Sequence, residues 1–521
     1  MGSYLYYYFF GKEETNDLFK YEKYNNSYFL SSPYSSINFN SSFLINLSKE
    51  DFTINYNQID ILERNLNSKI VLLSHKQLKN KRVLKTSKII NEQYYNDYIK
   101  EIKALKYLDH PSIIKIYEYK IIQNKTVDIL IEYLKGPSLF SKLSQKKHFN
   151  EKETLIIMYQ LFSCIKMTHD NGITHRDIKP ENIIIIDEKN LYIKLIDYGS
   201  CEIFSEQNKE TNRRLGTPSY VSPEIIKGDN YSYECDIWAL GILMYFLLSG
   251  KVPFDGITQN EIFYSITNKK ISFEEEVWKD ISLDAKNLIK CLLIKDKNKR
   301  ININQILDTP WIINGLKLYN IKNNLHSKDF CINVIKINLM KFYEANINQL
   351  QLLFLFYIIH NYTDLNNEIL LLKNEFVYYD EDNDGKLSKN ELNNLLIDLD
   401  INEDAREKIL NTIFEIFGEN RGKYIFYESF LVIGLSNKKK YCNNEGIIKK
   451  FFELITKRKF DNYNINDNII KAHDLNNLLF VNNEDKFRKE ESLSLLENIG
   501  INEENNLNYE TFKNSLFGFK I

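Results

Sequence analysis

The sequence predicts an α+β chain in which a small β-rich lobe and a larger helical lobe precede a separate, all-helical module. Residues 57–135 contain short β-branched segments around one helical stretch at residues 91–108. Between residues 150 and 312, apolar side chains recur with the period of an amphipathic helix. The remainder of the chain alternates helical stretches with loops rich in Asp, Asn and Gly. A chain of 521 residues has room for this organisation, since one domain takes roughly 150 residues.

The composition is that of a globular protein whose positive and negative charges nearly balance. Hydrophobic residues make up 43% and aromatic residues 13%, enough to fill sizeable cores. Lys and Arg number 68 against 70 Asp and Glu, so the formal net charge is -2. This balance argues against a nucleic-acid partner and gives only weak support to a membrane surface. We expect a monomer.

Cysteine usage and apolar runs favour a cytoplasmic location. The six cysteines lie far apart, without the close pairs of metal or redox motifs. The apolar runs at residues 237–249 and 350–359 are shorter than the roughly 20 residues of a membrane span, so we expect buried helices. The chain begins Met1-Gly2, but Tyr6 occupies the position where myristoylation needs Ser or Thr. Membrane association is therefore only weakly supported, and a basic secretory leader is not seen.

The strongest motif is His-Arg-Asp-Ile-Lys-Pro-Glu-Asn at residues 175–182, followed by Asp-Tyr-Gly at residues 197–199. These segments resemble the catalytic loop and the magnesium-binding motif of eukaryotic protein kinases. Phosphoryl transfer needs an Asp to orient the hydroxyl and accept its proton, and metal ligands to neutralise phosphate charge. Asp177 fits the first role, and Asn182 and Asp197 fit the second.

The resemblance extends to residues on both sides of these motifs. It implies that Lys85 binds the ATP phosphates and pairs with Glu101, and that Ile70, Val83, Glu132 and Leu134 line the nucleotide site. Lys179 in the loop, together with Thr217, is typical of serine/threonine kinases. The segment Asp-Ile-Trp-Ala-Leu-Gly at residues 236–241 also matches the kinase pattern. The resemblance implies that Glu224 and Arg300 pair with each other, as a fold clamp rather than as catalysts.

The loop that should cover the ATP phosphates departs from the kinase pattern. Its glycine positions correspond to Glu63, Asn65 and Ser68, and glycine is absent between Lys12 and Lys135. Asn65 can adopt left-handed backbone conformations, but Glu63 places a carboxylate near an anionic ligand. We therefore expect weakened ATP binding. An alternative stays open, in which the chain is a pseudokinase or a very weakly active calcium-responsive scaffold.

A calcium-binding loop is complete at residues 380–391, with the spacing D-x-D-x-D-G-x5-E. Calcium binds six to eight oxygens, which this loop can supply from carboxylates, a backbone carbonyl and a hydroxyl. The six ligands are Asp380, Asp382, Asp384, Lys386 through its carbonyl, Ser388 and Glu391. Three further loops, at residues 418–429, 463–474 and 500–511, lack the paired end carboxylates. We expect them to pair structurally without metal.

A kinase domain followed by a linker and four such units resembles the calcium-dependent protein kinases of plants and protists. The resemblance implies an α+β bilobal protein kinase fold joined to an all-α EF-hand (calmodulin-like) domain. It implies a serine/threonine kinase that uses ATP, Mg²⁺ and Ca²⁺ on protein substrates, with a junction helix restraining the site until calcium binds. In that junction Ile335, Leu339 and Phe342 share a helical face, although an ordinary core helix is equally open. The expected boundaries are an irregular extension (1–56), the kinase domain (57–312), the junction (313–363), a first EF-hand pair (364–436) and a degenerate pair (437–521).

Overall fold

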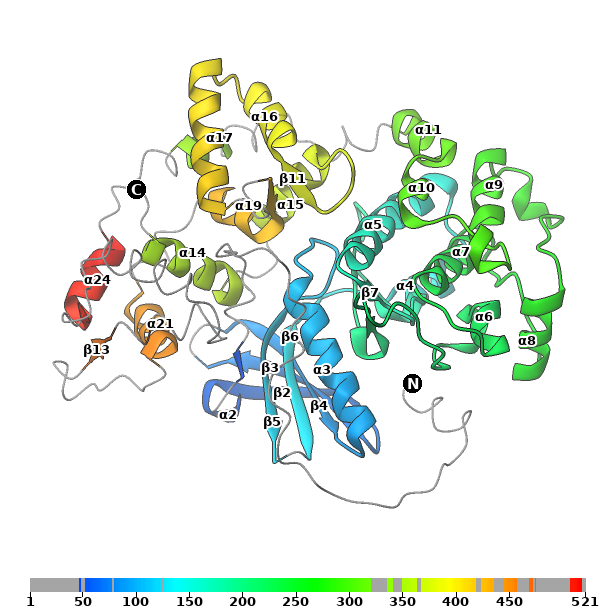
Figure 1. Cartoon of the computed structure of the whole chain (residues 1–521), viewed down its shortest axis with the longest axis horizontal. Helices are drawn as coiled ribbons and strands as arrows, with labels where there is room; N and C mark the ends of the chain where they lie inside the picture. The colour runs from blue at the N-terminus through cyan, green and yellow to red at the C-terminus, as the bar shows by residue number, and fades with distance from the viewer. Residues whose placement is uncertain are drawn as a thin grey trace. The chain divides into compact units, whose positions relative to one another are not determined.

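The computed structural model divides the chain into two compact units, Leu47–Ile321 and Lys322–Ile521 (Figure 1). The residues that it describes are 46–47, 52–76, 79–123, 125–319, 335–340, 349–362, 367–417, 423–434, 444–456, 468–471, 474 and 507–517. The predicted order of a β-rich lobe, a helical lobe and a separate helical module is confirmed.

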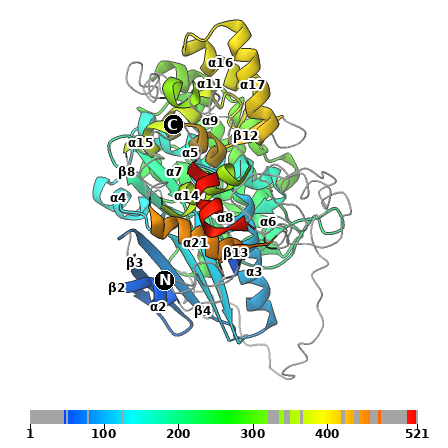
Figure 2. The ribbon, with the colours of Figure 1, turned by 90° about the vertical axis from the view of Figure 1, so that its left-hand side faces the viewer.

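An antiparallel sheet forms the small lobe of the first unit. Its strand order is β1-β5-β6-β4-β3-β2, and Figure 2 shows β2, β3 and β4 running side by side. The strands are β1 (Asn46–Leu47), β2 (Tyr56–Arg64), β3 (Ser68–His75), β4 (Lys81–Lys88), β5 (Ile116–Ile122) and β6 (Thr126–Glu132). Because β4 lies between β3 and β6, side chains at its centre are held in a fixed register from both sides.

The single long helix of this lobe is α3 (Glu92–Tyr107), which confirms the helix predicted at residues 91–108. It begins at Asn91, whose side chain accepts a hydrogen bond from the N–H of Tyr94, as an N-cap requires. Its buried positions include Ile102, Leu105 and the carboxylic acid Glu101. Burial of an acid on an otherwise apolar face indicates that Glu101 has a charged partner.

The irregular extension expected up to residue 56 ends earlier than the sequence indicated. Helix α2 (Phe52–Asn55) precedes β2, and Phe52 packs with Val71, Leu73, Tyr117 and Leu130 in one apolar cluster. A four-residue helix carries no measurable periodicity, so the sequence could not reveal it. The last residues before 57 therefore belong to the β-rich lobe.

The large lobe is helical and surrounds α5 and α7. Its helices are α4 (Leu139–Lys146), α5 (Glu151–Asp170), α6 (Pro223–Lys227), α7 (Glu234–Ser249), α8 (Gln259–Asn268), α9 (Leu283–Leu292), α10 (Ile303–Leu307) and α11 (Pro310–Leu318). The short strands β7 (Ile173–Thr174), β8 (Ile183–Asp187), β9 (Tyr192–Leu195) and β10 (Glu202–Ile203) carry the loops between them. Gly241 lets α7 approach α9 closely, since a Cβ there would lie 2.8 Å from the Cβ of Leu292.

The boundary expected between residues 312 and 313 falls inside a helix. In α11, Trp311 and Ile312 are buried, and so is Gly315, which a Cβ would bring within 2.5 Å of Leu155 in α5. The helix therefore completes the large lobe rather than opening a junction. The sequence placed the boundary too early because the apolar pattern of α11 runs across it.

The second unit contains helix-loop-helix elements joined in pairs by short strands. Its helices are α14 (Gln349–Tyr362), α15 (Asn367–Tyr379), α16 (Lys389–Asp398), α17 (Glu403–Phe417), α19 (Tyr427–Gly434), α21 (Glu445–Thr456) and α24 (Tyr509–Phe517). Strand β11 (Lys386–Ser388) pairs with β12 (Tyr424–Phe426), and β13 (Ile469–Ile470) pairs with β14 (Leu507–Asn508). Both views show α21 and α24 beside β13 (Figures 1 and 2).

Two apolar segments of the region expected as a junction lie within this second unit. Helix α14 contacts both α19 and α24, and its residues 351–360 are all buried. In the helical segment 335–340, Ile335 and Leu339 are buried, and Asn338 donates to the carbonyl of Gly434 at 2.7 Å. Phe342, expected on the same face, lies outside the described residues. Among the described helices, none is long and apolar enough to cross a membrane. The apolar runs predicted to be buried helices lie in α7 and α14, and most of their side chains are buried.

Candidate active site and calcium loop

Three charged residues from distant parts of the first unit meet at Lys85. The residue lies in the middle of β4, opposite Ile70 on β3 and Ile129 on β6. Its Nζ donates to Oε1 of Glu101 at 2.7 Å and to Oδ1 of Asp197 at 3.0 Å. The structure thus brings together three residues that the sequence assigned to one site.

The ionisation of this trio follows from its geometry. Burial opposes the charge of Lys85, but the carboxylates of Asp197 and Glu101 outweigh it and raise the pKa of Lys85 above its usual range. The charge of Lys85 lowers the pKa of Asp197 to about 2. Burial raises the pKa of Glu101, although Lys85 acts in the opposite direction. Lys85 is therefore cationic and Asp197 anionic at neutral pH, as phosphate and metal binding require.

Three side chains donate to the Asp177 carboxylate. Lys179 Nζ and the amide of Asn182 donate to one oxygen at 2.6 and 3.1 Å, and the hydroxyl of Thr217 donates to the other at 2.9 Å. The amide of Asn182 also donates to the carbonyl of Asp177 at 2.9 Å, which fixes the loop between them. A carboxylate has about four acceptor positions, so these contacts leave room for one further donor such as a substrate hydroxyl.

A buried carboxylate beneath the loop sets its shape. Asp236 accepts from the backbone N–H groups of His175 and Arg176, both at 2.8 Å, and from Nε2 of His169 at 2.9 Å. Arg176 has a φ of +66°, a strained conformation that these bonds support. Asp236 therefore acts through the backbone and does not itself face a substrate.

The Glu224–Arg300 clamp implied by the resemblance is formed. Arg300 donates to both carboxylate oxygens of Glu224, at 2.7 and 2.9 Å, and both side chains are buried. Removing one partner of such a pair costs about 3–5 kcal/mol, because the other charge is left buried. Both residues lie in the helical lobe and stabilise its fold.

The residues expected to line the nucleotide lie on strands β3, β4 and β6 and just after the end of β6. Ile70 and Lys85 are direct cross-strand neighbours, and Val83 is buried opposite Ile131. The Glu132 carboxylate accepts a hydrogen bond from Nζ of Lys194 at 2.7 Å. Glu132 can therefore offer a nucleotide only its main chain. Leu134, two residues further on, is half-buried.

The hairpin between β2 and β3 closes without glycine and without left-handed backbone. Asn65 Oδ1 accepts from the N–H of Ser68 at 2.7 Å, the N–H of Asn67 at 3.2 Å and the hydroxyl of Ser68 at 2.9 Å. Asn65 is not among the described residues with positive φ, so it does not use the left-handed conformation that is open to Asn. The Asn side chain replaces a glycine turn by bonding its own backbone.

The loop at residues 380–391 has the charge arrangement of a divalent cation site. The carboxylate oxygens of Asp380, Asp382 and Asp384 lie within 4.8 Å of one another. Burial, followed by the charges of Asp384, Glu391 and Asp382, raises the pKa of Asp380 well above its usual value. Gly385 has a φ of +78°, which supplies the sharp turn. A buried group of like charges is stabilised by a cation, so these residues fit Ca²⁺.

The four loops identified in the sequence pair two by two through short strands. Leu387 lies opposite Ile425, and Ile470 lies opposite Leu507. Each is the eighth residue of one of the four loops identified in the sequence. Parts of the second, third and fourth loops lie outside the described residues. Among the described residues, Asp380, Asp382 and Asp384 form the carboxylate cluster that could hold a metal ion.

Calcium binding to the Asp380 loop is expected to release protons at pH values below the raised pKa of Asp380. The raised pKa of Asp380 means that the calcium-free loop binds more protons than the unfolded chain, so its folded state loses stability as pH rises towards that pKa. Calcium displaces the proton, so the affinity should increase with pH over the same range. Calorimetric titrations in two buffers with different ionisation enthalpies measure this directly. Equal apparent enthalpies in both buffers would refute proton release.

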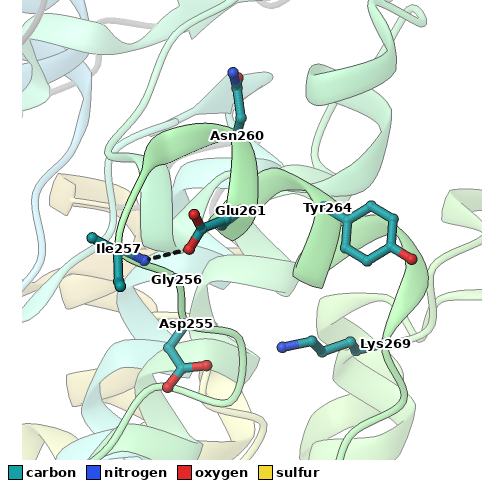
Figure 3. Close-up of a pocket in the computed structure, with 7 residues that line it drawn as sticks. All are labelled: Asp255, Gly256, Ile257, Asn260, Glu261, Tyr264 and Lys269. Atoms are coloured by element: carbon teal, nitrogen blue, oxygen red, sulfur yellow. Dashed lines mark hydrogen bonds between the residues drawn. The ribbon is translucent and has the colours of Figure 1, made fainter.

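A separate cavity of 580 Å³ lies on the large lobe near the start of α8 (Figure 3). It is lined by Asp255, Gly256, Ile257, Asn260, Glu261, Tyr264 and Lys269. Glu261 accepts from the N–H of Ile257 at 2.9 Å and so fixes one wall. The lining contains none of the residues assigned to catalysis, so this cavity is distinct from the nucleotide site.

Several residues around the site could not be identified from the sequence. Thr217 contacts both Asp177 and Lys179, yet in the sequence it only marked a kinase type. Lys194 and Glu202 were not singled out, because each follows a motif without being part of it. Glu202 follows Asp197 by five residues, and this short separation is the one feature of the sequence that could have drawn attention to it.

Comparison with known proteins agrees with this geometry. Residues 66–312 match the protein kinase domain family. A protein of Plasmodium berghei (strain Anka) named calcium-dependent protein kinase 3 is 33% identical over 339 residues, 65% of this chain and 58% of that protein. A protein of the same name from Plasmodium yoelii yoelii is 31% identical over 394 residues, 72% of this chain and 71% of that protein.

The fold, the site and the domain match define the first unit as a protein kinase domain. The chain belongs to the calcium-dependent protein kinase family, as its motifs predicted. The aligned region spans less than two thirds of the Plasmodium berghei protein.

Proposed function

We propose that the chain transfers the γ-phosphoryl group of ATP to serine or threonine hydroxyls of proteins, and that calcium controls this activity. The observation that carries the proposal is the assembled trio of Lys85, Glu101 and Asp197. A Lys on β4 paired with a Glu on α3 is the arrangement that an active kinase requires. Thr217 bonded to Asp177 and Lys179 supports a choice of serine and threonine.

Each residue has a role that its surroundings support. Bound ATP with Mg²⁺ supplies the transferable phosphoryl group and neutralises its charge. Lys85 binds phosphate oxygens, while Asn182 and Asp197 are the metal ligands. Asp177 orients the attacking hydroxyl and accepts its proton, and Lys179 balances the charge of Asp177 from 2.6 Å. Glu101 keeps Lys85 in place.

Calcium control is assigned to the Asp380 loop and the segment before it. The segment 335–340 and α14 are buried within the same unit as the loop. A change in the angle between the helices on either side of the loop would therefore act on them first. We propose that the part of the chain between the end of α11 and residue 363 carries this change to the kinase domain as a regulatory junction.

The buried cysteines support a proposal about the compartment. Cys164, Cys201 and Cys235 are buried thiols that take part in no disulfide. Burial raises the pKa of Cys201 and of Cys235 above the ordinary thiol value, so both stay protonated and unreactive. We propose a reducing, cytoplasmic setting.

The glycine-free hairpin is expected to weaken ATP binding through Asn65. Its side chain occupies two backbone N–H groups that a glycine-rich loop would direct at phosphates. Asn65→Gly should lower the KM for ATP about two- to tenfold, because one hydrogen bond contributes about 0.5–1.5 kcal/mol. Glu63→Gly should act in the same direction by removing a negative charge. Asn67→Gly is the control, since it loosens the turn but keeps the Asn65 acceptor; an equal effect there, or none at Asn65, would contradict the assignment.

Phosphoamino-acid analysis tests the proposed chemistry. The full chain, ATP labelled at the γ-phosphate, Mg²⁺ and a mixed Ser, Thr and Tyr peptide library are incubated with calcium. Label on serine and threonine, but not on tyrosine, is the expected result. Label on tyrosine would refute the substrate class, and absence of label would favour the scaffold.

A further inference from the structure

An exposed arginine lies close to the catalytic carboxylate along the chain. Arg214 is three residues before Thr217, whose hydroxyl donates to Asp177 at 2.9 Å. Three residues of chain span at most about 11 Å, so the Cα atoms of Arg214 and Thr217 lie within about that distance. An extended peptide advances by the same length per residue. A substrate hydroxyl at Asp177 therefore brings residues near it in sequence within reach of the Arg214 side chain.

The stretch between Arg214 and Thr217 is held against the catalytic loop. Leu215 is buried. Gly216 has a φ of +116°, and a Cβ there would lie 3.3 Å from the carbonyl oxygen of Arg176. Thr217 is bonded to Asp177. Because consecutive residues are fixed in this way, the position of the Arg214 backbone relative to Asp177 is fixed as well.

The two consecutive arginines of this stretch have different surroundings. Arg213 is half-buried and donates to both carboxylate oxygens of Asp97 on α3, at 2.5 and 2.7 Å. Arg214 is exposed, and within the described part of the chain its guanidinium has no hydrogen bond or ion pair. The fold thus uses the charge of Arg213 and leaves the charge of Arg214 to a ligand or to solvent.

The Arg214 guanidinium lies against a glycine at the end of α6. A Cβ added at Gly228 would meet Nη2 of Arg214 at 2.8 Å, and Gly228 has a φ of +80°. Glycine therefore serves both the left-handed turn and the space that the guanidinium takes. Lys227 and Asp229 flank this glycine, and both are exposed. Their opposite charges largely cancel, so packing places the Arg214 cation and leaves it available to an anion.

We propose that Arg214 is a specificity-determining residue that binds an acidic side chain of the protein substrate within three residues of the acceptor hydroxyl. A guanidinium binds a carboxylate through two parallel hydrogen bonds, so it selects for both charge and planar shape. The inference rests on the proposed kinase function and names the substrate class of its site. A purely structural Arg214, stabilising the end of α6, would instead affect every peptide alike.

The test measures kcat/KM of the full chain with saturating calcium, Mg²⁺ and ATP. Each peptide carries one acceptor serine in an uncharged background, with Asp, Asn or Lys placed in turn at the three positions on either side. Wild type should prefer Asp to Lys about three- to tenfold at one position, since an exposed ion pair contributes modestly and a like-charge contact opposes binding. Arg214→Glu should reverse this order at the same position. Arg214→Gln should abolish the preference, and Arg214→Lys should keep its direction.

Lys270→Glu is the matched control, because Lys270 is an exposed cation two residues beyond the end of α8 and the substitution changes the charge equally. It should keep the wild-type preference. The ratio between Asp and Lys peptides is measured within each variant, so a loss of folded protein in Arg214→Glu lowers both values and leaves the ratio interpretable.

Two results would overturn the inference. One is equal kcat/KM for Asp and Lys peptides at every position in wild type. The other is the same order of preference in wild type and in Arg214→Glu. Absence of phosphoryl transfer in every form would refute the proposed function instead. Binding of fluorescent Asp and Lys peptides without ATP, measured by anisotropy in wild type and Arg214→Glu, would still decide the role of Arg214, since equal affinities would contradict it.

Discussion

Asp177→Ala is expected to lower kcat for peptide phosphorylation about 10²- to 10⁴-fold, the usual loss when a positioned acid or base is removed. The KM for ATP should stay close to wild type, because Lys85 and Asp197 are held by each other and by Glu101. Steady-state kinetics with saturating calcium and magnesium measure both constants. A loss in kcat with KM unchanged is the signature of an interaction made in the transition state.

Asp170→Ala is the control for this substitution. Asp170 ends α5 and pairs with Lys166 at the surface, so its removal should leave both constants unaffected. Full activity in Asp177→Ala would show that another group accepts the proton or that transfer does not occur at this loop. A large rise in the KM for ATP would show instead that Asp177 binds the nucleotide.

Glu391→Gln is expected to abolish calcium activation. Both oxygens of Glu391 accept backbone N–H bonds, from Glu381 and Ser388, each at 2.7 Å, so the residue closes the loop from its twelfth position. Substitution of a residue that only supports the metal ligands typically lowers metal affinity 10- to 100-fold. Loss of a ligand carboxylate should therefore lower the affinity about 100-fold or more. Wild type should bind one ion per chain in calorimetry, and its activation should follow calcium with a Hill coefficient of about 1.

Glu407→Gln provides the comparison, because Glu407 is exposed on α17 and outside the loop. It should bind calcium and respond to it as wild type does. Two or more strong sites in wild type would refute the assignment of the other loops as metal-free pairing units. Activation that survives Glu391→Gln would place the calcium switch elsewhere.

The parts of the site that the sequence predicted are those with fixed chemistry and spacing. Lys85, Glu101 and Asp197 could be assigned to one place because phosphoryl transfer needs these groups in this order, and their contacts are as expected. The Asp380 loop could be identified for the same reason, since six oxygens must come from one short segment.

Contacts that depend on tertiary packing could not be predicted. The ion pairs of Glu202 with Arg176 and Lys100 join residues that lie far apart in the sequence, and only the fold brings them together. Phe52 joins an apolar cluster from a helix of four residues, too short for a pattern. The sequence indicated that Asn65 stands at a glycine position but not which contacts it makes, because an Asn can close a turn either with its backbone or with its side chain.

Calcium-controlled phosphoryl transfer is tested most directly by the rate of peptide phosphorylation by the full chain in excess calcium and in excess chelator. We expect phosphoryl transfer to serine or threonine that rises on addition of calcium and falls to the level of Asp177→Ala on chelation. Transfer at the same rate in calcium and chelator, or no transfer above Asp177→Ala in either, would refute a calcium-regulated kinase.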